Sequence, residues 1–146
     1  YNNEKIDALV SLPHGEGFGL PLFEAAYSGL PVVTVGWSGQ LDFLVDAEGK
    51  EQFYNVAFDL QPVQKEVHWE GVIVPDSMWA YAREGSAKKQ MRACYEDMAA
   101  RITKHNNSEI TKRFAPDRMY KKFVDEILGF DSSLIEIQEQ EVLEFE

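Results

Sequence analysis

The sequence holds only one cysteine, Cys94, and three histidines among its 146 residues. A single cysteine cannot form a disulfide within the chain or assemble a thiolate metal cluster, which makes the cytoplasm the expected location. Cys94 falls within a helical apolar pattern and is expected to be a small core residue, not a nucleophile.

Long apolar stretches and long basic stretches are also missing. No apolar stretch is long enough to cross a bilayer, and no basic segment precedes an apolar one at the start. The 14 Lys and Arg against 25 Asp and Glu give a formal net charge of −11. Because an acidic chain without a basic run is poorly suited to a phosphate backbone, nucleic acid is not an expected partner.

The length and the 45% hydrophobic content support one compact domain, which we place at residues 1–129. Residues 5–12 are typical of a buried strand, and the first residue is not Met, so we expect a fragment that begins within a fold. Residues 130–146 form a predicted acidic tail with six acidic residues and no Lys or Arg. Its Leu134, Ile135 and Ile137 offer contacts to a neighbouring chain, so a homo-oligomer formed through this tail is one expected partner.

The apolar pattern predicts an α/β fold. Its first elements are a strand at 6–12, a glycine loop at 13–19, a helix from Pro21 to Gly29, a strand at 31–35 and a loop at 36–40. A strand, helix and strand of this length imply a right-handed crossover in a parallel sheet, with the glycine loop at the carboxyl edge of the first strand.

The later part of the chain adds two strands and two helices to this prediction. Strands are expected at 54–60, half-exposed near a sheet edge, and at 71–74. A helix from Ser86 carries Met91, Tyr95, Met98 and Ile102 on one stripe, and a second helix runs from 116 to 128 until Gly129 ends it.

Two glutamates flank the start of the first helix. Glu16 lies in the glycine loop and Glu24 lies inside the helix, with seven residues between them. The unpaired N–H groups and positive dipole end of a helix N-terminus favour an anion such as a diphosphate, and glycines let the backbone approach it. Two hydroxyl acceptors beside an anion site suit a nucleotide sugar.

Residues 11–26, SLPHGEGFGLPLFEAA, followed by 29–33, GLPVV, resemble the E-x7-E segment of group 1 retaining glycosyltransferases, which are GT-B enzymes of glycosyltransferase family four. The resemblance implies a Rossmann-like parallel sheet flanked by helices, the C-terminal half of a GT-B fold truncated at its N-terminus. It continues more weakly through residues 38–42, 78–81 and 113–116, and it is specific only in 11–35.

The resemblance also implies the roles of single residues. Glu16 would contact the hydroxyls of the donor sugar and is the candidate catalytic residue, while Glu24 would hold the ribose hydroxyls. Backbone amides around Gly19 and Leu20 would take the distal phosphate. The other candidate substrate-binding residues are Gly17, Phe18, Ser38, Gly39 and His14.

Two of these assignments carry an alternative. His14 borders the expected cleft, although a loop histidine is more often solvated or structural. Ser38 stands where the family often has a glycine, so the role of its loop is less specific.

The implied substrate is a nucleotide diphosphate sugar, from which a hexose-like sugar is transferred with retention to an unknown acceptor. No metal and no cofactor are implied, because helix amides and basic side chains can stabilise a diphosphate leaving group. The whole enzyme would be cytoplasmic or peripheral to a membrane.

Parts of the family pattern are absent from this sequence. The family carries an Arg and a Lys ahead of the first glutamate, where this sequence has only Lys5 in another context. The N-terminal acceptor-binding domain is missing too, so the chain alone is expected to bind donor weakly and to turn over little or nothing. Arg83 and Lys88 follow the motif and are interpreted as solvated.

Three alternatives stay open. A nucleotide-sugar epimerase would need an acid or base from another domain, and a phosphorylase would need a lysine for pyridoxal phosphate. A non-catalytic interaction module would keep only the fold.

Overall fold

The computed structural model describes residues 1–100 and 107–129. The chain divides into two compact units, residues 1–111 and residues 112–146. The elements of the first unit are β1 (Leu9–Val10), α1 (Leu20–Tyr27), β2 (Val32–Val35), α2 (Leu41–Leu44), β3 (Tyr54–Val56), β4 (Phe58–Pro62), the 3-10 turn η1 (Lys65–Val67), β5 (Met78–Ala82) and α3 (Glu84–Ala99). Helix α4 (Ser108–Arg113) spans the boundary, and α5 (Pro116–Leu128) lies in the second unit.

The first unit is built on a small parallel sheet with the order β1-β2-β3. Leu9 pairs with Val32, and Val33 pairs with Tyr54. Helix α1 connects β1 to β2 in the predicted strand, loop, helix, strand order. The mixed α/β class with a parallel sheet is therefore confirmed.

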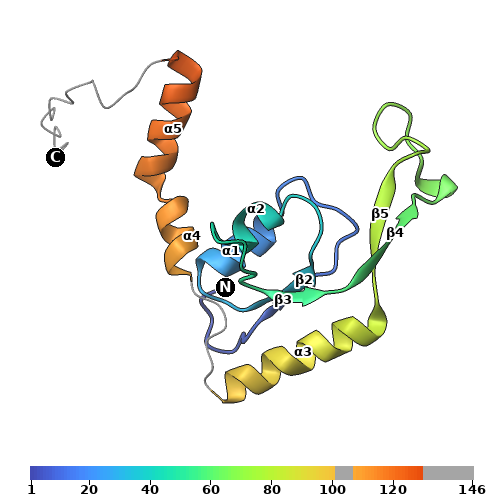
Figure 1. Cartoon of the computed structure of the whole chain (residues 1–146), viewed down its shortest axis with the longest axis horizontal. Coiled ribbons are helices and arrows are strands. Elements are labelled where there is room, and N and C mark those ends of the chain that lie inside the picture. The colour runs from blue at the N-terminus through green and yellow to red at the C-terminus, as the bar shows by residue number, and fades with distance from the viewer. Residues whose placement is uncertain (101–106, 130–146) are drawn as a thin grey trace, which may run out of the picture. The chain divides into compact units, whose positions relative to one another are not determined.

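Helices cover both faces of this sheet, with α1 and α2 on one side and α3 on the other (Figure 1). All four residues of β2 are buried, as expected of a central parallel strand. On the α3 side, β2 and β3 pack against Ala87 and Cys94. Cys94 is buried, so its predicted role as a core residue is confirmed.

The contact between α3 and β3 includes one polar pair. The Tyr54 hydroxyl donates to Asp97 Oδ2 over 3.0 Å. Burial of the ring and this hydrogen bond raise the pKa of Tyr54 well above its usual value, so the phenol is neutral at physiological pH.

The predicted strand at 54–60 is two strands. Its first part, β3, belongs to the parallel sheet, whereas β4 forms an antiparallel hairpin with β5 in which Leu60 lies opposite Ala80. The break is at Ala57, whose amide donates to the Ser86 hydroxyl instead of to a neighbouring strand. Alternation continues across the break, so periodicity alone could not reveal it.

The predicted strand at 71–74 is wrong. Gly71 has a φ of 75°, and the segment is a tight turn closed by an isolated bridge between Trp69 and Ile73. The apolar run contains only three residues after the glycine, which is too short to extend the hairpin beyond this turn.

β1 is shorter than the predicted strand at 6–12. It pairs only with β2, and Ile6, Val10 and Leu12 are exposed. Only Leu9 and Val10 pair with β2 in the ladder, so the strand is limited to these two residues.

The predicted apolar stripe of α3 is wrong for Met91 and Tyr95 and confirmed for Met98. Met91 and Tyr95 are exposed, while the face toward the sheet consists of Ala87 and Cys94, with Met98 packed beside them. Small residues let the helix approach the sheet closely, and this geometry overrides the larger side chains that set the sequence pattern. Ile102, the fourth predicted member, lies outside the described residues.

In the second unit, α5 has the predicted bounds. Pro116 occupies its first turn, and Gly129 ends it with a φ of 64°. The predicted tail at 130–146 lies outside the described residues. Among the helices that are described, none combines the length and the apolar character needed to span a bilayer.

Candidate functional site

Two loops meet at the carboxyl edge of the parallel sheet. Residues 11–19 follow β1, and residues 36–40 follow β2. Because β1 and β2 run parallel, both loops leave the sheet at the same edge, where α/β proteins bind ligands. Most of the predicted site residues lie on these two loops and on the first turn of α1.

The two loops are joined by a hydrogen-bonded clasp. The Ser38 hydroxyl donates to the Glu16 carbonyl oxygen over 2.6 Å and accepts the Glu16 amide over 3.2 Å. The Gly39 amide donates to the same carbonyl oxygen over 3.1 Å. Ser38 and Gly39 thus fix the backbone of Glu16 and leave its carboxylate unused by the clasp.

The clasp requires a very close approach of backbone to backbone. A Cβ added to Gly39 would lie 2.0 Å from the Gly17 carbonyl oxygen, so no larger residue fits. Ser38 has a φ of 75°, a left-handed conformation that glycine adopts more easily. The serine keeps this conformation and contributes the hydroxyl that a glycine would lack.

Helix α1 begins at the centre of this region without a side-chain cap. Its N-cap is Gly19, with a φ of 86°, and Pro21 stands in its first turn. The first intrahelical bond runs from the Phe23 amide to the Gly19 carbonyl, so the earlier amides have no helical partner. Within the described part of the chain, the amides of Leu20 and Leu22 make no hydrogen bond; Leu20 is exposed, whereas Leu22 is buried.

A buried glutamine lies beside the N-cap. Gln40 is fully buried, and the Cβ position of Gly19 is 3.4 Å from its Cβ. Its Nε2 donates to the Val35 carbonyl, while its Oε1 has no partner among the described residues. An unsatisfied buried acceptor costs about 1–3 kcal/mol, so this oxygen can accept a hydrogen bond from a ligand or a water.

The two glutamates stand differently. Glu16 is half-buried, and its Cβ lies 3.8 Å from the Cβ position of Gly19, beside the helix start. Glu24 is exposed. It lies on the same side of α1 as Leu20, which precedes it by four residues. Desolvation and a hydrogen bond with the Glu24 carboxylate raise the pKa of the Tyr1 phenol. Glu24 is thus within reach of a hydroxyl donor.

His14 is held by the β4–β5 hairpin. Its Nδ1 donates to the Ala80 carbonyl over 2.8 Å, and its own carbonyl accepts the Ala80 amide over 2.9 Å. The ring stacks on Trp79 at a centroid distance of 5.0 Å and meets Tyr81 at 4.4 Å. These contacts give His14 a structural role, and in the neutral ring they leave Nε2 as a hydrogen-bond acceptor.

Phe18 anchors the loop from its other end. Its ring lies 5.4 Å from Phe23 of α1 and 5.0 Å from Phe43 of α2, measured between centroids. Phe18 therefore contributes packing that fixes the start of α1, and any contact with a ligand phosphate falls to its backbone.

The basic residues after the motif are engaged elsewhere. The Arg83 guanidinium pairs with Asp59 on the hairpin, with 2.9 Å between Nε and Oδ2, and this pairing lowers the pKa of Asp59. Lys88 pairs with Glu84 on the same helix, and all four side chains are largely exposed. In the part of the chain that the structure describes, no three His, Cys, Asp or Glu side chains gather as metal ligands.

Sequence reasoning missed three contributors to this region. Gln40 gave no signal because its burial depends on the loop path, and a glutamine after a glycine is normally solvated. Trp79 and Tyr81 gave no indication of a partner in the sequence, whereas in the structure both rings contact His14. Their positions depend on the β4–β5 hairpin, whose start was hidden inside one alternating run.

Comparison with family models, curated proteins and solved structures gave no match for this chain. The geometry of the two loops and the resemblance of residues 11–35 therefore carry the functional argument together.

Proposed function

We propose that this chain is the donor-binding part of a retaining glycosyltransferase with a GT-B fold, of the group 1 type that the E-x7-E segment resembles. The donor is a nucleotide diphosphate sugar, and the whole enzyme transfers its hexose-like sugar to an acceptor. The observation that carries the proposal is the start of α1, which has no side-chain cap. There the Leu20 and Leu22 amides, which have no hydrogen-bond partner among the described residues, lie between the loop of Glu16 and the helix position of Glu24.

The amides of Leu20 and Leu22 bind the diphosphate in this proposal. Both lie in the first turn of an eight-residue helix, where the helix dipole adds to their attraction for an anion. Pro21 lies between them and takes no part because it has no N–H.

The two carboxylates take hydroxyl groups on either side of the diphosphate. Glu16 begins beside the N-cap, which suits the sugar attached to the distal phosphate. Glu24 stands one turn further along the exposed side of α1, where its carboxylate faces solvent and suits the ribose hydroxyls.

Two carboxylates beside a diphosphate also repel it. The helix amides offset part of this repulsion, so we expect the isolated chain to bind donors weakly and to transfer sugar little or not at all. Binding is therefore the property to measure, not turnover.

The test separates the two glutamates. Glu24→Ala should weaken the binding of UDP, GDP or ADP, whichever the chain prefers, by roughly 10- to 150-fold, because a hydrogen bond to a charged group contributes about 1.5–3 kcal/mol. Glu16→Ala should leave the affinity for the free nucleotide unchanged and weaken only the corresponding nucleotide sugar. Isothermal titration calorimetry measures both.

Glu70→Ala is the matched control, since this exposed glutamate lies in the distant 69–73 turn and should change neither affinity. Equal weakening by Glu16→Ala and Glu24→Ala for the free nucleotide would contradict the assignment of roles. A wild-type chain that binds no nucleotide would instead support a non-catalytic interaction module.

A further inference from the structure

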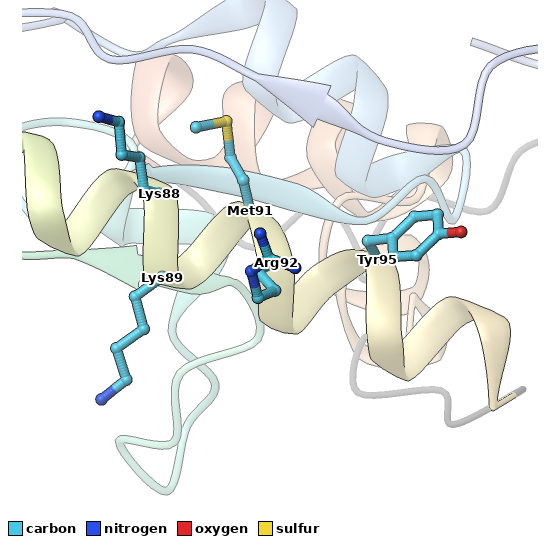
Figure 2. A pocket seen from close by; sticks show the side chains of 5 residues that line it. All are labelled: Lys88, Lys89, Met91, Arg92 and Tyr95. Atoms are coloured by element: carbon cyan, nitrogen blue, oxygen red, sulfur yellow. The ribbon is translucent and has the colours of Figure 1, made fainter.

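Helix α3 has a second face that packs against nothing in the described structure. Its inner face, Ala87 and Cys94, covers the sheet. Its outer side carries exposed side chains around a shallow hollow of about 560 Å³, lined by Lys88, Lys89, Met91, Arg92 and Tyr95. We call this set the α3 outer face (Figure 2).

The α3 outer face combines apolar and basic side chains. Tyr95 is 68% exposed and Met91 is 39% exposed, although both are large hydrophobic residues. In Figure 2, Met91 and Lys88 point to one side of the helix, and Lys89 points to the opposite side. Exposed large apolar side chains interspersed with basic ones are typical of an interface more than of a solvated helix face.

Its positive charge is largely uncompensated. Lys88 pairs with Glu84, but Lys89 and Arg92 have no ion-pair partner among the described residues. Three cations within five residues are unusual in a chain with a net charge of −11. The partner that fits them is an acidic segment with its own apolar side chains.

The chain itself contains a segment of that chemistry. Residues 130–146 hold six acidic residues and no Lys or Arg, with Leu134, Ile135 and Ile137 among them. We propose that the α3 outer face of one copy binds the acidic segment 130–146 of a second copy. Tyr95 and Met91 receive its apolar side chains, and Lys89 and Arg92 pair with its carboxylates.

The dimensions agree with a short linear segment. Lys88 and Tyr95 are seven residues apart, which spans about 10 Å along a helix. Three or four residues of an extended chain cover that length, so one short stretch with apolar and acidic side chains is enough. This inference does not depend on the donor site, because α3 lies on the other side of the sheet from α1.

Sedimentation velocity of the full chain tests the proposal. The wild type should self-associate at about 0.05 M salt and dissociate at about 0.5 M, since screening weakens exposed charge pairs. Lys89→Glu with Arg92→Glu should raise the dissociation constant at least about tenfold at low salt. Lys50→Glu with Lys65→Glu is the matched control, which makes the same charge change away from α3 and should preserve association.

A charge-swap variant tests the pairing of the two surfaces more specifically. Combining Lys89→Glu and Arg92→Glu with Glu139→Lys and Glu141→Lys in one chain should restore association, and circular dichroism verifies that every variant is folded. A wild type that stays monomeric, or a control pair that loses association equally, overturns the proposal. Salt-sensitive binding of a monomeric wild type to phosphatidylserine vesicles, lost in the α3 variant, would overturn it in favour of a lipid surface.

Discussion

Gly39→Ala should unfold the clasp between the two loops and abolish nucleotide binding. The added methyl group would lie 2.0 Å from the Gly17 carbonyl oxygen and 3.0 Å from that of Glu16, and both are backbone atoms that cannot rotate away. The 36–40 loop must then separate from the 13–19 loop, which breaks the bonds of Ser38 and Gly39 to Glu16. We expect the free energy of unfolding to fall by about 3 kcal/mol.

Gly85→Ala is the matched control for this substitution. Gly85 lies in the first turn of α3, has no atom within 4 Å of an added Cβ, and has an ordinary backbone conformation. Alanine there should stabilise the chain by about 0.5–1 kcal/mol because glycine is a poor helix former. Urea unfolding compares the two variants. A Gly39→Ala chain as stable as the wild type would contradict the close approach of the loops.

Leu22→Ala should be the most destabilising substitution in α1. Leu22 is 1% exposed, and its Cδ1 lies 3.4 Å from the Cβ position of Gly19, so it fixes the helix start to the core. Removing a fully buried leucine side chain leaves a cavity and costs about 3–4 kcal/mol. Because the Leu20 and Leu22 amides are positioned by this packing, nucleotide binding should weaken as well.

Leu20→Ala makes the same chemical change at a position that is 57% exposed. It should alter the free energy of unfolding by less than about 0.5 kcal/mol. Chemical denaturation followed by tryptophan fluorescence gives both values. Equal losses for Leu20→Ala and Leu22→Ala would show that α1 is not anchored to the core through Leu22.

The sequence predicts best where local signals agree with the tertiary environment. Pro21 and Gly29 marked the ends of α1, and the β-branched run at 32–35 formed the buried strand β2. Pro116 and Gly129 did the same for α5. In each case the residue type limits the backbone directly, so the neighbouring elements could not override it.

Prediction failed where packing chose between equivalent local patterns. The large side chains of α3 implied that Met91 and Tyr95 face the core, but Ala87 and Cys94 pack against the sheet instead. Both stripes have helical spacing, and only the distance between helix and sheet selects one of them. The short extent of β1 likewise depends on a pairing partner, which no local signal specifies.

The residues of the candidate site could be predicted from the sequence, but the contacts that hold them together could not. The glycines and glutamates of 13–24 could be read from their spacing, as could Ser38 and Gly39 from their place after β2. The clasp itself consists of hydrogen bonds from the Ser38 hydroxyl and the Gly39 amide to the backbone of Glu16, more than 20 residues away in the sequence, which spacing cannot reveal. The burial of Gln40 Oε1 without a partner and the hydrogen bond of His14 to the β4–β5 hairpin also depend on residues far away in the sequence.

The most direct measurement is a two-dimensional amide NMR titration of the chain with UDP, GDP and ADP. If the uncapped turn binds the diphosphate, the largest shifts should fall on the amides of Gly19, Leu20 and Leu22, with smaller ones at 38–40 and none along α3. This method detects the weak binding that we expect. Shifts confined to other parts of the chain, or unchanged α1 amides at saturating nucleotide, would contradict a diphosphate site at this turn.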